Sequence, residues 1–288
     1  MLATLSLAVM LAGAYANPEQ LVETDWVAAH ATDPGVRVVD MRREDFEKGH
    51  VAGAVHLAPT DIRAAANPPT FLPSQAAFEA MMGRLGISNA TRVVVYDDRG
   101  GIYAARMWWI LNYFGHEKVA LMNGGWTKWT AEKRPLSKAA ETPAAATFTA
   151  RPQPRWLAVA ADVVQATSNP FASIIDARTA AEIGGQNLAS STPVKRGGKI
   201  PASIAIYWED LLDPTLKTFK PADELRKLFE SKGIVPEQDV IAYCLVGMRA
   251  SVDLFALHLL GYNKLKNYYG AWEEWGNRDD LPLSQQLP

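Results

Sequence analysis

The stretch DVIAYCLVGMRASVDLFALHLLG (Asp239 to Gly261) combines two apolar patterns with the only cysteine of the chain, Cys244. The run from Asp239 to Tyr243 is short and apolar, as in a strand that is buried on both faces of a parallel sheet. After the cysteine, apolar residues recur at helical spacing up to Gly261, where a glycine is suited to end a helix. The stretch therefore predicts a strand, a tight loop and a helix, which is a unit of an α/β fold.

The same pattern occurs earlier in the chain. RVVVYDDRGGIYAARMWWILNYFGHEKVALMNGGWTKW (Arg92 to Trp129) aligns with Asp239 to Trp275, and the first copy has one extra residue in its loop. The aligned pairs are Tyr96 with Tyr243, Gly115 with Gly261, and Trp126 with Trp272. A repeat of this length predicts a tandem duplication of one structural unit.

A second pair of segments lies upstream of each copy. VVDMRREDF (Val38 to Phe46) aligns with IIDARTAAEI (Ile174 to Ile183), which matches Asp40 to Asp176 and Arg42 to Arg178. We predict a first domain over residues 17–136 and a second over residues 155–288. Residues 137–154 are rich in Pro, Ala and Thr and are predicted to be a linker. Each domain is expected to be a parallel sheet flanked by helices.

Residues 1–16 are apolar and small, and they end in Ala14-Tyr15-Ala16. This pattern is typical of a signal peptide with its cleavage site, although the segment has no Lys or Arg before the apolar run. It is too short for a bilayer span. We therefore expect a periplasmic or secreted protein without stable membrane insertion after the leader is removed; a cytoplasmic location is the alternative.

Composition excludes several other classes of protein. The formal net charge is -2, which gives no basic surface for nucleic acid or an anionic membrane. One cysteine cannot form an internal disulfide, and neither Cys nor His spacing resembles a metal site. We expect no cofactor and no metal, and partners that are small molecules.

Cys244 is predicted to lie at the carboxyl end of a strand, where ligands bind in open α/β sheets. The backbone N–H groups at the start of the following helix, together with Arg249, favour the thiolate over the thiol. Cys244 is therefore a candidate nucleophile. The alternative is an inert buried cysteine, which is common in proteins.

Several motifs together resemble the rhodanese sulfurtransferases. They are YCLVGMRAS after the second-copy strand, DAR (Asp176 to Arg178), RGGKIPASI (Arg196 to Ile204) and LLGYNKLKNYYGAWEEW (Leu259 to Trp275), with GHVAGAVHL and NGGWTKW in the first copy. The match is to the tandem-domain type, which includes thiosulfate and 3-mercaptopyruvate sulfurtransferases.

The resemblance implies a reaction and a set of site residues. Cys244 would carry a persulfide, and Leu245, Val246, Gly247, Met248 and Arg249 would form the loop that cradles it. Sulfane sulfur would pass from thiosulfate to a thiophilic acceptor, cyanide or a thiol. In the first copy Asp97 stands in place of the cysteine, so that domain is expected to be inactive. We expect the protein to be a monomer.

Two departures from the family pattern leave the donor open. Leu245 and Val246 match neither the thiosulfate nor the 3-mercaptopyruvate subtype, so 3-mercaptopyruvate is the alternative donor. Glu182 stands where many members have a donor-binding arginine. Arg249 is then the best candidate cation and Arg178 is a second; Lys195, Arg196 and Lys199 of the following insert could also supply the positive charge. Other classes are a non-catalytic sulfur carrier and a Cys-based phosphatase, but the phosphatases place five residues between Cys and Arg and this chain places four.

Overall fold

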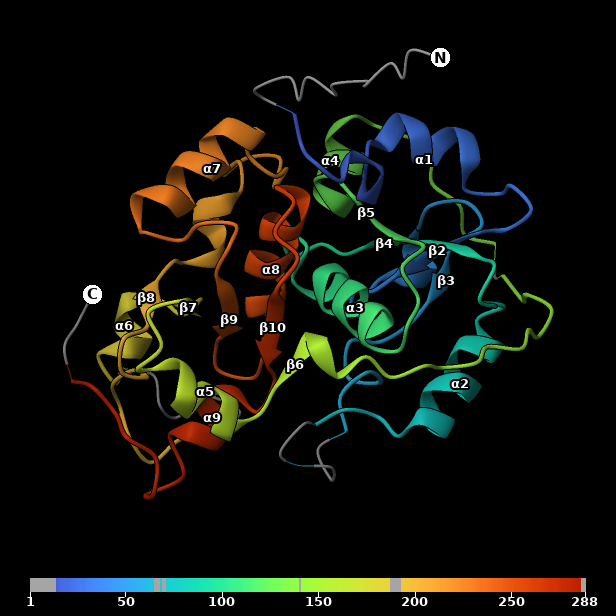
Figure 1. Ribbon diagram of the computed structural model, residues 1–288. Coiled ribbons are helices and arrows are strands. Elements are labelled where there is room, and N and C mark those ends of the chain that lie inside the picture. Colours follow the sequence, from blue (N-terminus) through green and yellow to red (C-terminus); the bar gives the residue numbers. More distant parts are fainter. Residues whose placement is uncertain (1–13, 65–67, 69–70, 140, 187–192, 286–288) are drawn as a thin grey trace, which may run out of the picture.

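Two five-stranded parallel sheets with the same strand order form the two halves of the protein (Figure 1). The computed structural model describes residues 14–64, 68, 71–139, 141–186 and 193–285. The first sheet has the order β1-β5-β4-β2-β3 and the second the order β6-β10-β9-β7-β8. All pairings within both sheets are parallel. The α/β prediction and the duplication are confirmed.

The elements of the first half run from a 3-10 turn to a short helix. They are η1 (Pro18–Gln20), β1 (Leu21–Val22), α1 (Thr24–His30), β2 (Val36–Asp40), η2 (Phe46–Lys48), β3 (Val55–His56), α2 (Gln75–Arg84), β4 (Arg92–Tyr96), α3 (Ile102–Tyr113), β5 (Val119–Met122) and α4 (Gly125–Ala131).

The second half repeats this order, except that a helix, α6, stands in place of η2 and one 3-10 turn, η4, is added before α7. Its elements are η3 (Pro154–Trp156), β6 (Leu157–Ala158), α5 (Ala160–Ala166), β7 (Ala172–Asp176), α6 (Ala180–Ile183), β8 (Ile204–Ala205), η4 (Trp208–Leu211), α7 (Ala222–Ser231), β9 (Asp239–Tyr243), α8 (Ala250–Leu259), β10 (Leu265–Tyr268) and α9 (Ala271–Trp275).

Helices cover both faces of each sheet, which explains the almost fully apolar strands. One apolar cluster runs from α2 and α3 of the first half into α7 and α8 of the second, and two smaller clusters fill the outer faces. At the boundary the ring of Trp108 on α3 meets that of Phe255 on α8 edge-on, with centroids 5.1 Å apart. In Figure 1, α3 and α8 lie next to each other at the middle of the molecule. The two helices that follow the candidate loops therefore meet at the domain interface.

The segment predicted to be a linker lies against the first domain. Ala146 donates a backbone hydrogen bond to Gly83 at 3.0 Å, and Arg151 donates one to Phe114 at 2.9 Å. No helix or strand is assigned to its described residues before η3 begins at Pro154. The segment is irregular in conformation but is fixed to α2 and to the end of α3.

Candidate active site

Cys244 directly follows β9, the central strand of the second sheet, and its side chain is fully buried. The loop then turns through Gly247, whose φ of 75° is in the left-handed region. A Cβ at Gly247 would come within 2.5 Å of the Tyr269 ring. Both the backbone conformation and this close contact require glycine. The predicted order of strand, cysteine loop and helix is confirmed.

The equivalent loop of the first domain binds a carboxylate. Asp97, which is 1% exposed, accepts four backbone hydrogen bonds of 2.7 to 2.9 Å, two on each oxygen. The donors are Arg99, Gly101, Tyr103 and Ala104. Burial raises the pKa of Asp97, whereas these N–H donors act in the opposite direction. The duplicated strand, loop and helix thus form a nest of N–H groups around an anion.

The loop of the second domain has the corresponding donors free. In the part of the chain that the structure describes, no other protein group accepts a hydrogen bond from the backbone N–H groups of Leu245 to Arg249. The loop is held through its carbonyl groups instead. Cys244 accepts from Trp272 and Leu245 accepts from Glu273, both at 2.9 Å. The loop is therefore fixed while its N–H groups remain available for an anion on Cys244.

Arg249 closes the loop with a bidentate ion pair to Glu182. Its Nη1 and Nη2 atoms donate to the two carboxylate oxygens at 2.7 and 2.6 Å. Glu182 also accepts from the backbone and hydroxyl of Thr179, in the capping box of α6. Burial by itself raises the pKa of Glu182, but the hydrogen bonds and charge of Arg249 lower it to about 2. Much of the positive charge of Arg249 is thus neutralised before any donor arrives.

The lowered pKa of Glu182 predicts a loss of stability in acid. Its contribution is present above the unfolded-state value of about 4.3 and is lost as the pH falls toward 2. In urea unfolding at about pH 6, the free energy of unfolding of the parent should exceed that of Glu182→Gln by about 2 kcal/mol. This difference should shrink below about pH 4. A difference that does not change with pH would contradict this account of the pair.

Arg178 lies in a buried network inside the second domain. Its guanidinium binds Asp176 at 2.7 and 2.9 Å, donates to the Gly198 carbonyl at 2.8 Å, and lies 4.2 Å from the centre of the Trp272 ring. The side chain is 1% exposed. The first domain has the same arrangement in Arg42, Asp40, Gly49 and Trp126, although it has no cysteine. The expected contact of Arg178 with the donor does not agree with this burial, and we assign Arg178 to the support of the fold.

Residues of both domains that sequence reasoning did not identify lie around the loop. Arg63 forms an ion pair with Glu273, whose backbone holds Leu245. Tyr269 is fully buried, lies against Gly247 and stacks on Trp109 of α3 at 4.8 Å. No local sequence pattern marks these residues, because their contacts arise from the packing of one domain on the other.

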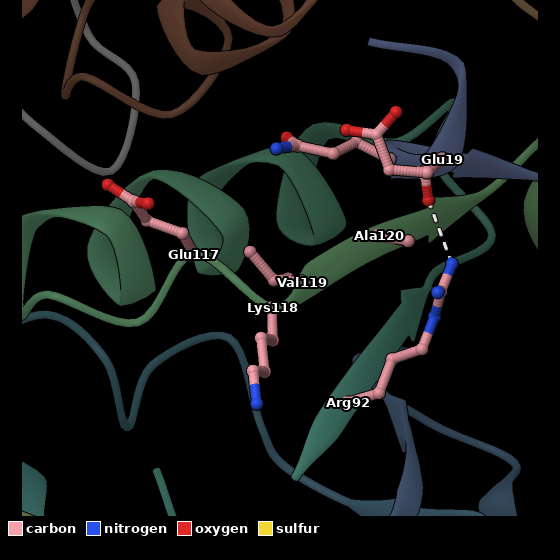
Figure 2. Close-up of a pocket in the computed structure, with 7 residues that line it drawn as sticks. Glu19, Arg92, Glu117, Lys118, Val119 and Ala120 are labelled. Carbon is pink, nitrogen blue, oxygen red and sulfur yellow. Dashed lines mark hydrogen bonds between the residues drawn. The ribbon is translucent and has the colours of Figure 1, made fainter. Parts of the chain in front are cut away.

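A cavity of about 320 Å³ lies away from this site (Figure 2). Arg92 and Val119, which line it, are the first residues of β4 and β5, whereas Asp97 follows the other end of β4. Arg92 donates to the Glu19 carbonyl at 2.9 Å. The cavity is therefore at the amino ends of the strands and takes no part in the cysteine loop.

Neither a metal centre nor a membrane span is found in the described ranges. No three His, Cys, Asp or Glu side chains of these ranges gather as metal ligands. Within the same ranges, no helix has both the length and the apolar character needed to cross a bilayer.

The rhodanese-like domain family matches both halves of the chain, over residues 23–132 and 159–278. The chain belongs to this family. The resemblance drawn from the motifs is confirmed, and both rhodanese-like domains coincide with the two sheets described above.

Three relatives match almost the whole of this rhodanese-like chain. It is 36% identical to the sulfur carrier protein TtuD of Thermus thermophilus, over 94% of this chain and 98% of the relative. It is 35% identical to the thiosulfate sulfurtransferase of Corynebacterium glutamicum, over 93% and 91%. The crystal structure of SseA, a 3-mercaptopyruvate sulfotransferase of Escherichia coli, superposes with a TM-score of 0.77 at 30% identity, covering 88% of this chain and 98% of that one.

Proposed function

We propose that this rhodanese-like protein is a sulfurtransferase that moves sulfane sulfur from thiosulfate to a thiophilic acceptor through a persulfide on Cys244. Relatives with this activity in their names match over nearly the full length, which supports the proposal. The observation that carries it is the pair of equivalent loops. One loop holds the Asp97 carboxylate with four N–H groups, and the other has Cys244 at the same place beside unpaired N–H groups.

The chemistry follows from this arrangement. The Cys244 thiolate attacks the outer sulfur of thiosulfate, the sulfur–sulfur bond of the donor breaks, and sulfite leaves with the electron pair. The persulfide that forms is an anion, which the N–H groups of Leu245 to Arg249 and the start of α8 stabilise. Cyanide or a thiolate then attacks the terminal sulfur and releases the Cys244 thiolate. No cofactor is needed, because each step exchanges one nucleophile for another at the transferred sulfur.

Mass spectrometry tests the donor directly. The protein is incubated with thiosulfate and, in parallel, with 3-mercaptopyruvate, and the intact mass is measured after the excess is removed. We expect a gain of one sulfur atom with thiosulfate that is removed by cyanide. A gain with 3-mercaptopyruvate alone would move the assignment to that donor, and no gain with either would contradict the sulfurtransferase proposal.

A non-catalytic sulfur carrier is the second candidate, because the relative TtuD is named as one and is 36% identical. Turnover separates the two functions. With thiosulfate and cyanide in excess, an enzyme forms thiocyanate well beyond the amount of protein, whereas a carrier that only loads from a partner forms no more than one equivalent.

Arg249 is proposed to bind the anionic donor. Arg249→Ala should raise the KM for thiosulfate by about 10-fold or more, since a hydrogen bond to a charged group contributes about 1.5–3 kcal/mol. Glu182→Gln is the matched control: it removes the other half of the ion pair but leaves the guanidinium, so its KM should stay at or below that of the parent. Equal KM values in Arg249→Ala and the parent would count against donor binding.

We also propose that residues 1–16 are a leader and that the mature protein is a periplasmic or secreted monomer. Residues 1–13 lie outside the described residues. The Ala16 N–H donates to the Leu259 carbonyl at 2.7 Å and the Tyr15 hydroxyl donates to the Lys220 carbonyl, so cleavage after Ala16 would remove both contacts. Export in a bacterial host followed by N-terminal sequencing checks the leader, with Asn17 as the expected first residue and Met1 as the contrary result. The molar mass from analytical ultracentrifugation tests whether the protein is a monomer.

A further inference from the structure

Most guanidinium groups around the cysteine loop already have a carboxylate partner. These pairs are Arg249 with Glu182, Arg63 with Glu273, and Arg178 with Asp176. A paired guanidinium contributes little net field at the thiolate, because the carboxylate cancels much of its charge. The persulfide that we propose on Cys244 adds a negative charge to a fully buried position. The charge balance of the site therefore depends on any cation that has no carboxylate of its own.

Arg106 is such a cation. It lies on α3 of the first domain, is 2% exposed, and forms no ion pair with any carboxylate in the described ranges. Its Nε and Nη2 atoms are buried and donate to no protein group of these ranges. An unpaired buried charge is costly, so a partner is expected nearby.

The surroundings of Arg106 lead to Cys244. Burial lowers the pKa of Arg106, whereas a negative charge on Tyr269 or Cys244 would raise it. The guanidinium lies 5.4 Å from the centre of the Tyr269 ring. Tyr269 in turn touches Gly247 in the middle of the loop, and its hydroxyl has no hydrogen-bond partner in the described residues. Arg106, Tyr269 and the loop thus form one contiguous group across the domain interface.

The other groups that face Cys244 add no competing negative charge. Asp253 on α8 is fully buried with neither carboxyl oxygen bonded in the described chain, and burial raises its pKa well above the usual range. Burial likewise raises the pKa of Tyr269. Burial thus favours the neutral form of both groups. A sulfur anion on Cys244 is left as the partner of Arg106.

We propose that Arg106 is the counter-cation of the sulfur anion on Cys244, so that the domain without a cysteine completes the active site of the domain that has one. This inference rests on the proposed persulfide chemistry. Arg106 acts as a positioning residue, since it stabilises the thiolate before sulfur is taken and the persulfide afterwards.

The pH dependence of alkylation tests the proposal. Cys244 is the only cysteine, so the rate of modification by iodoacetamide reports on its thiolate alone. In Arg106→Met, the midpoint of the rate–pH profile should rise by about one unit or more, which lowers the rate at pH 6 by about 10-fold. Arg106→Lys should retain the parent midpoint, as should the control Arg92→Met, which removes an arginine of the first domain at the opposite end of β4. A parent-like midpoint in Arg106→Met would overturn the proposal.

A double-mutant cycle keeps the test decisive if Arg106→Met is poorly stable. Unfolding midpoints are compared for Arg106→Met, Cys244→Ser and the double variant, with Arg106→Gln used if the methionine variant does not fold. Coupling predicts that the arginine substitution costs less in the Cys244→Ser background, and additive effects would contradict it. Sulfur loading of the parent is measured alongside. If the parent takes up sulfur and the alkylation midpoint of Arg106→Met equals that of the parent, only this inference is contradicted. If the parent takes up no sulfur, the sulfurtransferase proposal is contradicted.

Discussion

Cys244→Ser should take up no sulfur from thiosulfate and should form thiocyanate at least about 10³-fold more slowly than the parent, because serine removes the nucleophile. Serine differs from cysteine by a single atom, so the loop and its N–H groups should keep their places. No second cysteine can replace Cys244, since the chain has only one. Intact-mass measurement and a thiocyanate assay with excess cyanide are the two readouts.

The control for this substitution is a measurement of thermal unfolding, which shows whether Cys244→Ser keeps its fold. Cys244→Ser should remain folded, because the bonds from Trp272 and Glu273 to the loop carbonyls do not involve the side chain of residue 244. Its thermal midpoint should fall below that of the parent by no more than the proposed pairing of Arg106 with the Cys244 anion contributes. Sulfur uptake that persists in a folded Cys244→Ser would show that the sulfur binds elsewhere and would overturn the assignment of the site.

Arg178→Met should destabilise the second domain by about 3–5 kcal/mol, which is the usual cost of removing one partner of a buried ion pair. Among the described residues, the substitution leaves the fully buried Asp176 carboxylate with two hydrogen-bond donors, the Tyr243 hydroxyl at 2.6 Å and the backbone N–H at position 178. It also removes the bond to the Gly198 carbonyl. Urea unfolding followed by tryptophan fluorescence measures the loss.

Arg42→Met is the matched control for Arg178→Met, because Arg42 has the same partners in the first domain. Both variants should lose similar stability, and the KM of the folded Arg178→Met for thiosulfate should stay within about 2-fold of the parent. A stable Arg178→Met with a strongly raised KM would restore the donor-binding role that the sequence suggested for Arg178.

Much of the fold was predictable because strands and helices are determined by local apolar periodicity. The runs Arg92 to Tyr96 and Asp239 to Tyr243 were expected as strands, and they are β4 and β9. The sequence also contains the capping-box pattern of α6, formed by Thr179 and Glu182. It would have placed the Glu182 side chain at the start of a helix without identifying Arg249 as its partner.

The chemistry of the site was less predictable from sequence. Arg178 and Arg249 have the same side chain and both lie beside a loop, yet one is 1% exposed at the side chain and the other 19%. Their burial depends on what the rest of the domain packs over them. A pattern of residue types therefore could not separate the buried arginine from the one that we propose to bind the donor.

The amino-acid sequence was enough to predict the strand, loop and helix around Cys244, the tandem duplication, and the contrast between Cys244 and Asp97. These features depend on neighbouring residues and on the comparison of two aligned copies. The ion pair of Glu182 with Arg249, and the approach of Arg106 from the other domain to Tyr269 beside the loop, became visible in the three-dimensional structure alone. Such pairs form between residues far apart in the chain, and their positions depend on strand order and on the packing of α3 against α8.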